Sequence, residues 1–337
     1  MDINHTLQYT INDMVDDKRG ILAADESAPT IKKRFDTINL ESTEENRRHY
    51  RSLLLEAEGL GDYISGVILY EETLGQKNAT GTLLPEVAWN QKIVPGIKVD
   101  QGTEPLSGAP GDLITKGLDG LAERLKNYIK QGARFAKWRE VYPITATNPT
   151  TLGLHANAER LAHYAATCQE LGVVPIVEPE VLMDGDHDIK RCEEVTELVL
   201  HSVFRALHCY GVTLEYMILK PNMVLPGKGC RTASPEEIAE ATISVFNRTV
   251  PAAVPSINFL SGGQTPEEAT RNLNAINQFI GPWQLSISYG RALQEPVLKT
   301  WEGKPTNIIA AQAALLKRAR LNSLAHQGKY KTAMESE

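Results

Sequence analysis

MILKPNM, residues 217–223, is the stretch that decides the fold, because a strand-like run ends there in a single lysine. The run begins at residue 213, and Pro221 and Asn222 end it directly after Lys220. Burying an ammonium without a partner is unfavourable, so a lysine at the last position of a buried strand is unusual. In a dry site near another cation the proton leaves more easily, and the neutral amine can form a Schiff base with a carbonyl. The alternative is that Lys220 reaches solvent from the strand end.

The composition is that of an ordinary soluble protein, with 337 residues of which 42% are hydrophobic and 23% are charged. This length fits two domains or one α/β barrel. The net charge is −7 and no basic block stands out, which argues against a nucleic-acid partner. Residues 1–20 lack a signal-peptide core, and no run approaches the ~20 apolar residues that cross a bilayer. We therefore expect a cytoplasmic protein with no membrane partner.

Strand-like and helix-like segments alternate along the whole chain, which is typical of a parallel sheet. Eight such units fit a closed barrel better than an open sheet, and no change in composition marks a domain boundary. The prediction is an α/β fold, a single (β/α)8 (TIM) barrel over residues 1–337, with a short mobile tail at about 328–337. The predicted strands are 21–24, 63–70, 93–99, 135–140, 173–177, 213–220, 256–260 and 284–288, with loops at 81–92 and 100–112.

Ionisable or phosphate-binding groups follow seven of the eight predicted strands, whereas the strand middles are apolar. In a parallel barrel the carboxyl ends of the strands meet on one rim, where reactive groups gather. Residues two apart on a strand point to the same side. The groups on this rim are Asp25, Lys98, Lys137 with Arg139, Glu178 with Glu180, Lys220, Ser261 with two glycines, and Arg291.

The charged residues on this rim suggest roles for one another. Lys137, on a strand near Lys220, is the candidate for the second cation beside it. Glu178, Glu180 and Asp25 are candidates for proton transfer. The alternative is an ion-pair network that only closes the barrel.

Two groups of residues are suited to bind phosphate. Ser261-Gly262-Gly263 precedes a capped helix and offers backbone N–H groups, and Arg291 ends the eighth strand, where barrels often bind phosphate. The second group consists of Lys98, Arg139 and the hydroxyls of Ser27 and Thr30. Two anion sites that flank one amine predict a substrate with phosphates at both ends and a carbonyl near one of them.

Residues 184–188, DGDHD, look like a metal-binding loop, but the pattern fails in detail. An EF-hand requires glycine at position six and glutamate at position twelve, where this chain has Ile189 and Val195. No H-x-x-H or H-E-x-x-H motif is present. We therefore expect chemistry that uses no metal and no cofactor.

These residues resemble the class I, Schiff-base-forming fructose-1,6-bisphosphate aldolases over about residues 18–330. The strings GILAADES, TEENRR, GIKVDQG, FAKWR, VPIVEPE, LKPNMV, FLSGGQ, LNAIN and SYGRAL occur in the family's order. The resemblance implies a barrel, often tetrameric, and a cytoplasmic lyase of glycolysis and gluconeogenesis. Its reaction is the reversible cleavage of fructose 1,6-bisphosphate into dihydroxyacetone phosphate and glyceraldehyde 3-phosphate.

The resemblance also implies roles for single residues. Lys220 is similar to the Schiff-base lysine, and Glu178 to the acid/base that helps to expel water. Asp25 is similar to the group that takes the C4 hydroxyl proton, Lys137 to the cation beside the imine, and Glu180 to a supporting carboxylate. The residues that match the phosphate site nearer the ketone are Ser261, Gly262, Gly263, Ser288, Gly290 and Arg291, while Ser27, Thr30, Lys98 and Arg139 are expected at the other end.

The sequence departs from animal members of the family at its carboxyl end. Those members have a longer tail that ends in a tyrosine, which assists proton exchange at the enamine; Tyr330 does not replace it. An internal carboxylate is then expected to protonate the enamine, or that step is slower, and deletion of residues 331–337 should change turnover little. Two alternatives stay open: a preference for sedoheptulose 1,7-bisphosphate or fructose 1-phosphate, and a catalytically idle scaffold.

Overall fold

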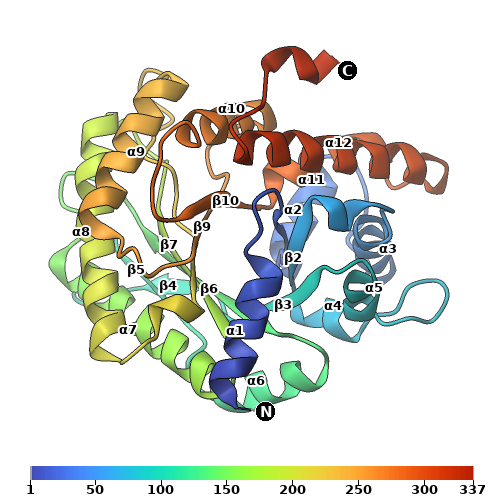
Figure 1. Cartoon of the computed structure of the whole chain (residues 1–337), viewed down its shortest axis with the longest axis horizontal. Coiled ribbons are helices and arrows are strands. Elements are labelled where there is room, and N and C mark those ends of the chain that lie inside the picture. The colour runs from blue at the N-terminus through green and yellow to red at the C-terminus, as the bar shows by residue number, and fades with distance from the viewer. Residues whose placement is uncertain (1, 337) are drawn as a thin grey trace.

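The computed structural model describes residues 2–336 and forms a closed barrel of eight parallel strands (Figure 1). The strands follow one another around the barrel in the order β1-β10-β9-β8-β7-β6-β3-β2. This confirms the predicted single-domain (β/α)8 barrel. The strand bounds are β1 Gly20–Ala24, β2 Ile64–Leu69, β3 Val94–Lys98, β6 Phe135–Tyr142, β7 Val174–Val181, β8 Ile218–Leu219, β9 Ser256–Phe259 and β10 Gln284–Tyr289.

Helices surround the barrel, and α1 lies across its opening (Figure 1). The helix bounds are α1 Ile3–Met14, α2 Ala28–Asp36, α3 Glu44–Leu55, α4 Glu71–Gly75, α5 Leu84–Asn90, α6 Leu121–Lys130, α7 Thr151–Glu170, α8 Ile189–Cys209, α9 Pro235–Thr249, α10 Pro266–Ile276, α11 Arg291–Trp301 and α12 Ile308–His326. Short 3-10 helices occupy Leu60–Asp62, Leu214–Tyr216, Pro305–Asn307 and Thr332–Ser336.

The structure corrects three local predictions. The expected loop 81–92 contains α5, whose first turn accommodates Pro85 because that position needs no N–H donor. The expected loop 100–112 contains β4, Thr103–Pro105, which pairs antiparallel with β5, Leu113–Thr115. The predicted strand 213–220 begins as a 3-10 helix and is reduced to Ile218–Leu219.

The lower interior of the barrel is apolar, and α1 closes it. Leu7, Ile11 and Met14 of α1 join one buried cluster with inward-facing residues of the strands. Phe135 belongs to this cluster, and a Cβ at Gly96 would lie 2.3 Å from its ring. Glycine at position 96 therefore gives Phe135 room to fill the barrel.

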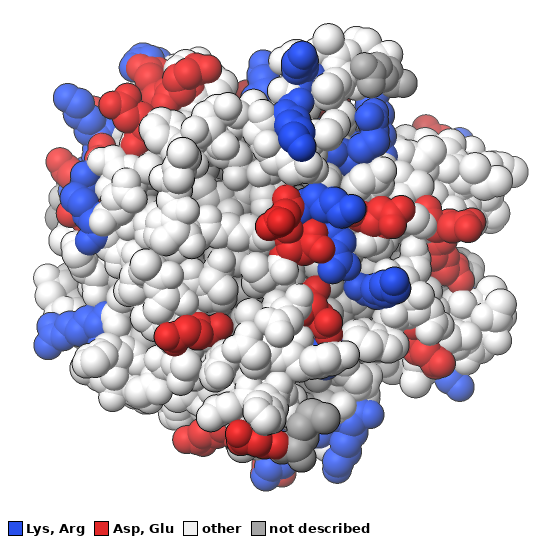
Figure 2. Space-filling model, viewed as in Figure 1, with Lys and Arg blue, Asp and Glu red and all other residues white. Residues whose placement is uncertain are grey.

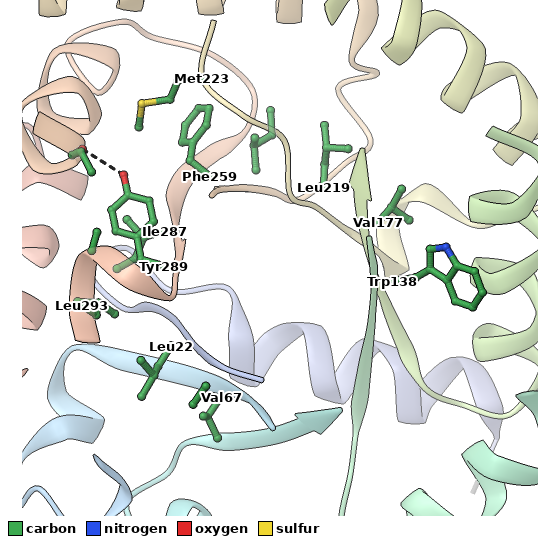
Figure 3. Packing of buried hydrophobic residues seen from close by; sticks show 14 of the residues in the cluster. Leu22, Val67, Trp138, Val177, Leu219, Met223, Phe259, Ile287, Tyr289 and Leu293 are labelled. Atoms are coloured by element: carbon green, nitrogen blue, oxygen red, sulfur yellow. Dashed lines mark hydrogen bonds between the residues drawn. The ribbon is translucent and has the colours of Figure 1, made fainter. Parts of the chain in front are cut away.

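The other face of each strand packs against the helices and forms the larger core (Figure 3). Trp138 stacks on Tyr164 of α7, with ring centroids 5.6 Å apart. Tyr289 is fully buried, and its hydroxyl donates to the carbonyl of Ala269 at 3.1 Å. Because the two faces alternate, the inward positions at the upper end of the barrel are free to carry the polar groups of the cavity.

The sequence predicts a short mobile tail at about 328–337, and in the structure two residues of this segment, Tyr330 and Glu335, contact the helices around the barrel. Tyr330 is 6% exposed, and its N–H donates to Asn274 Oδ1 at 2.9 Å. Glu335 pairs with Arg318 of α12 at 2.6 Å and accepts a hydrogen bond from the Tyr330 hydroxyl at 2.8 Å. These contacts hold the segment away from the barrel interior.

Deleting residues 331–337 should leave turnover almost unchanged and lower the free energy of unfolding by about 1–2 kcal/mol. The deletion takes away Glu335, the carboxylate that pairs with buried Arg318. Arg318 still donates a hydrogen bond to the Pro266 carbonyl at 3.0 Å, which limits the loss. Urea unfolding and steady-state kinetics would measure both quantities. Glu335→Gln alone should reproduce most of the stability change, and a large loss of turnover would show that the segment takes part in the reaction.

Lys and Arg are intermingled with Asp and Glu on the face shown in Figure 2, and no broad patch of one sign covers it. Within residues 2–336, no helix combines the length and the apolar character that a bilayer crossing requires. A dense group of charged side chains lies inside the upper end of the barrel, where it lines a cavity.

Candidate active site

The upper end of the barrel holds a cavity of about 410 Å³, and all of the predicted site residues line it. On β7 the inward row begins with apolar Ile176 and ends with the charged side chains of Glu178 and Glu180. The strand alternation predicted from the sequence thus brings these groups together. The lining residues that were not predicted include Ala23, Glu26, Arg34, Leu182, Met183, Asp184, Lys228 and Leu260.

Lys137 is the centre of the charge network. Its ammonium lies 2.8 Å from Asp25 Oδ2, 3.2 Å from Glu178 Oε2 and 3.8 Å from Asp100 Oδ2. Burial lowers the pKa of Lys137, but the three carboxylates outweigh it and leave the pKa well above its usual range. Lys137 is therefore a fixed cation.

Asp25 is correspondingly a fixed anion. Burial raises its pKa, yet the charges of Lys137 and Lys220 outweigh burial and hold the pKa well below the usual range. The carboxylate is ionised at neutral pH and can accept a proton from a bound hydroxyl.

Lys220 directly follows β8, and a backbone hydrogen bond of Lys220 fixes its position relative to β7. Its N–H donates to Val177 O at 2.8 Å, which extends the β7–β8 ladder past Leu219. The side chain is 5% exposed, and Nζ is 3.3 Å from Glu178 Oε1. The lysine therefore points into the barrel, and the solvent-facing alternative is wrong.

Glu178 connects the two lysines, because one carboxylate oxygen faces Lys220 and the other faces Lys137. Its side chain is buried. A carboxyl group in this position can exchange a proton with an atom attached to Lys220 Nζ. Arg139 and Glu180, next along the same strands, pair at 2.5 Å.

The Ser261-Gly262-Gly263 loop and the end of β10 form one side of the cavity. Gly263 has φ of +79°, which favours glycine, and a Cβ there would meet Met183 at 2.9 Å. Ser288 is 1% exposed, and its Oγ has no hydrogen-bond partner among the described residues. Gly290 precedes α11, which begins at Arg291. An anion in this place would meet a helix start, a free hydroxyl and a guanidinium.

Comparisons with known proteins agree with this geometry. The family described as class-I fructose-bisphosphate aldolase matches residues 6–337. The chain belongs to the class I fructose-bisphosphate aldolase family. It is accordingly an aldolase, a lyase.

Individual relatives are similar over almost the whole chain. Fructose-bisphosphate aldolase 4, cytosolic, of Arabidopsis thaliana is 55% identical over 93% of this chain and 80% of its own. The probable fructose-bisphosphate aldolase class 1 of Xanthomonas campestris is 52% identical over 96% of this chain and 98% of its own. A solved structure of fructose-bisphosphate aldolase from Plasmodium falciparum, in complex with TRAP and a small-molecule inhibitor, has a TM-score of 0.96 and 51% identity, covering 98% of this chain and 96% of that one.

Sequence reasoning missed a cationic residue of this aldolase site, Arg34. Arg34 lies one turn beyond Thr30 on α2 and lines the cavity, where its Nη2 is 3.7 Å from a Cβ position at Gly290. Glu26 anchors Arg34 Nη1 at 2.7 Å and Arg51 Nη2 at 2.8 Å. The helical spacing from Ser27 and Thr30 could have indicated Arg34, because residues three and four apart share a helix face.

Residues 184–188 of the aldolase have structural roles. Asp188 caps α8 by accepting from Arg191 N at 2.8 Å, and Asp184 pairs with Lys228 at 2.8 Å. Gly185 O accepts from Gly229 N at 2.8 Å. The loop is thus joined to the loop that follows β8.

Glu140 is a buried carboxyl on the outer face of β6, away from the cavity. It is fully buried, and its Oε1 accepts from Trp138 Nε1 at 2.7 Å. Burial raises the pKa of Glu140 to about 8, so the folded aldolase keeps this carboxyl protonated at neutral pH.

We expect Glu140→Gln to stabilise the aldolase at alkaline pH. An unfolded glutamate ionises near pH ~4.3, so the unfolded chain releases a proton that the folded chain retains, and stability falls as pH rises from about 4 to 8. Glutamine keeps a hydrogen-bonding side chain without this proton, so the variant should exceed the wild type by about 1–3 kcal/mol at pH 8 and match it near pH 4. Urea unfolding across this range is the measurement. Glu123→Gln, at an exposed position of α6, is the control. Parallel pH slopes for Glu140→Gln and wild type would contradict the expectation.

Proposed function

We propose that Lys220 is the Schiff-base lysine through which this aldolase reversibly cleaves fructose 1,6-bisphosphate into dihydroxyacetone phosphate and glyceraldehyde 3-phosphate. One observation carries the proposal: a buried lysine whose Nζ lies 3.3 Å from a buried carboxylate, in a cavity with cationic groups on both sides. A lysine that served only a structural ion pair would have no need to line a cavity of this size.

The first stage is formation of the imine. Neutral Lys220 attacks the C2 ketone, and the new C–N bond gives a carbinolamine. Glu178 donates a proton to the departing hydroxyl, so water leaves and a protonated imine remains. The contact between Glu178 Oε1 and Lys220 Nζ supports this role, because the substituents of a C2 carbon bonded to Nζ would be within reach of the same oxygen.

The second stage is cleavage of the carbon–carbon bond. The protonated imine accepts the electron pair of the C3–C4 bond as Asp25 takes the proton of the C4 hydroxyl, which leaves an enamine on Lys220 and releases glyceraldehyde 3-phosphate. Asp25 suits this step because it is ionised and held at 2.8 Å by Lys137. Protonation of the enamine and hydrolysis of the imine then release dihydroxyacetone phosphate.

Phosphate binding at both ends holds the ketone at Lys220. The loop at Ser261, with Ser288, Gly290 and Arg291, would take the phosphate nearer the ketone. The other phosphate would meet Ser27, Thr30, Lys98 and Arg139. Ser27 Oγ and Thr30 Oγ1 are 3.1 Å apart at the start of α2, so one phosphate oxygen can bind both hydroxyls.

The enamine is protonated by an internal carboxylic acid in this proposal. Tyr330 is docked on Glu335 and Asn274, so its hydroxyl is engaged outside the barrel. Glu178 is the acid nearest to Lys220 among the described contacts, at 3.3 Å. Glu178 gives up its proton when water leaves the carbinolamine, so it takes up another proton from solvent before it protonates the enamine carbon.

The wider context follows from the family. We propose a cytoplasmic enzyme of glycolysis and gluconeogenesis, active as a homotetramer, that requires no metal and no cofactor. The naming of relatives as cytosolic supports the location. Size measurement in solution would test the tetramer, and activity in a metal chelator would test the absence of a metal requirement.

Borohydride trapping tests the mechanism. The protein is incubated with dihydroxyacetone phosphate, treated with borohydride, digested and analysed by mass spectrometry, with a parallel sample in chelator. An adduct on Lys220 that chelator does not affect is expected. Cleavage that chelator abolishes, without an adduct, would contradict the Schiff-base mechanism.

Two alternatives to the proposed function predict different results in activity and trapping assays. Faster cleavage of sedoheptulose 1,7-bisphosphate or fructose 1-phosphate would change the preferred substrate but keep Lys220 in its role. Sugar-phosphate binding without turnover or adduct would support the scaffold.

A further inference from the structure

Asp100 belongs to the GIKVDQG string and takes no part in the proposed reaction. It lies two residues beyond Lys98, so both follow the inward row of β3. Asp100 is 9% exposed and stands behind the residues that line the cavity. Its partners are all cationic or N–H groups, and they come from two neighbouring strands.

The carboxylate of Asp100 fixes the ammonium of Lys98. Lys98 Nζ contacts Asp100 Oδ1 and also donates to the backbone carbonyl of Asp100 at 2.7 Å. Two of the three ammonium protons are thereby used within the same loop. The third is left for the cavity, which Lys98 lines with a side chain only 15% exposed.

The second oxygen of Asp100 connects this pair to β6. Oδ2 accepts from the backbone N–H of Arg139 at 3.4 Å and lies 3.8 Å from Lys137 Nζ. Lys98 and Lys137 are register partners across β3 and β6. One carboxylate thus keeps two neighbouring ammonium groups at a fixed separation.

Asp100 is the charged partner of Lys98 and also lies near Lys137. Without the Asp100 carboxylate, Lys98 would lose this partner.

A lysine side chain loses considerable rotamer entropy when it is fixed. If Lys98 is already held before the substrate arrives, that entropy is lost on folding and not on binding. A charge-assisted hydrogen bond holds it more firmly than a neutral one does. Pre-positioning therefore strengthens the binding of an anion at the open side of Lys98.

We infer that Asp100 is a positioning residue that holds Lys98 for the phosphate at the end of the substrate away from the ketone. The inference rests on the proposed function, which places that phosphate at Lys98. Asp100 acts through Lys98, so its contribution should depend on a phosphate at that end.

The test compares fructose 1,6-bisphosphate with fructose 1-phosphate, which lacks the phosphate in question. The variants are Asp100→Asn, Lys98→Met and the double variant, with exposed Asp119→Asn as the matched control. Asp100→Asn should raise KM for the bisphosphate about three- to tenfold, and reduce kcat/KM on it at least threefold more than on fructose 1-phosphate. The double variant should resemble Lys98→Met, because residues that act through one contact are not additive.

The outcomes separate the inference from the proposed function. Equal losses on both substrates would mean a general structural role for Asp100, and a lower KM for the bisphosphate would mean that Asp100 competes with phosphate; either overturns the inference. Additive losses in the double variant would also overturn it. Wild-type protein that neither cleaves the bisphosphate nor forms the Lys220 adduct would instead overturn the proposed function.

Discussion

Replacing Lys220 by methionine should abolish both cleavage of fructose 1,6-bisphosphate and the borohydride adduct. Methionine has a similar length but no amine, so no C–N bond can form. The expected loss of kcat is about 10⁴-fold or more, because the covalent route disappears entirely. Lys220→Met should still fold. Glu178 loses the ammonium of Lys220 at 3.3 Å but keeps that of Lys137 at 3.2 Å, so its carboxylate is still paired.

Lys228→Met is the matched control for this experiment. Lys228 also lines the cavity, but its side chain is 57% exposed and pairs with Asp184 at the mouth. Its loss should change kcat less than about threefold, because an exposed ion pair contributes little, and the adduct should remain on Lys220. An adduct on Lys228 in Lys220→Met, together with substantial turnover, would show that the wrong lysine has been assigned.

The position of Lys220 could be predicted because two independent patterns agree on it. The apolar run before it predicts a strand end, and the rim argument places it among charges from other strands. The strand itself is only Ile218–Leu219, shorter than predicted, because residues 214–216 form a 3-10 helix before it. The register survives because Lys220 N donates to Val177 O, a bond that depends on the neighbouring strand.

The residues that were missed depend on how separate elements pack against one another. Alternation along a strand placed Lys137 and Arg139 on one side without knowledge of the packing. Arg34 required knowledge of how α2 is oriented against Gly290, and no strand pattern contains that information. Asp100 follows the end of β3 by two residues, so its role depends on contacts to β6 that arise only when the barrel closes.

The carboxyl-terminal segment shows the same limit. A run of small and polar residues after Tyr330 predicts mobility from composition alone. In the structure, Glu335 pairs with buried Arg318 on α12, and the Tyr330 N–H donates to Asn274, so long-range contacts join the segment to the helices. Composition does not report such a partner, because Arg318 looks like any other helix surface residue in the sequence.

Lys137→Met is expected to reduce both activity and stability strongly. The substitution leaves Asp25, Glu178 and Asp100 without the ammonium that they share. Buried carboxylates that lose their cation should cost about 3–5 kcal/mol of the free energy of unfolding. The kcat should fall by about 10²–10⁴-fold, because Asp25 would no longer be held ionised beside the C4 hydroxyl.

The pH dependence of the free energy of unfolding should show that the loss of the Lys137 charge causes the instability of Lys137→Met. The folded-state pKa of Asp25 is depressed, so its contribution to stability is present above the unfolded pKa of ~3.9 and is lost as pH falls through the folded value. In Lys137→Met burial dominates and raises that pKa, so the deficit against wild type should be largest near pH 7 and shrink towards pH 4 as the carboxylates take up protons. Urea unfolding at both pH values measures it.

Lys137→Met/Asp25→Asn separates folding from catalysis. Removing one of the unpaired carboxylates should restore about 1–2 kcal/mol of the lost stability, because less uncompensated negative charge is buried. It should restore no turnover, since the double variant lacks the group that accepts the C4 hydroxyl proton. A stability deficit that is equal at pH 4 and pH 7, and that Asp25→Asn does not relieve, would mean that Lys137 supports the barrel by packing and that its charge is dispensable for folding.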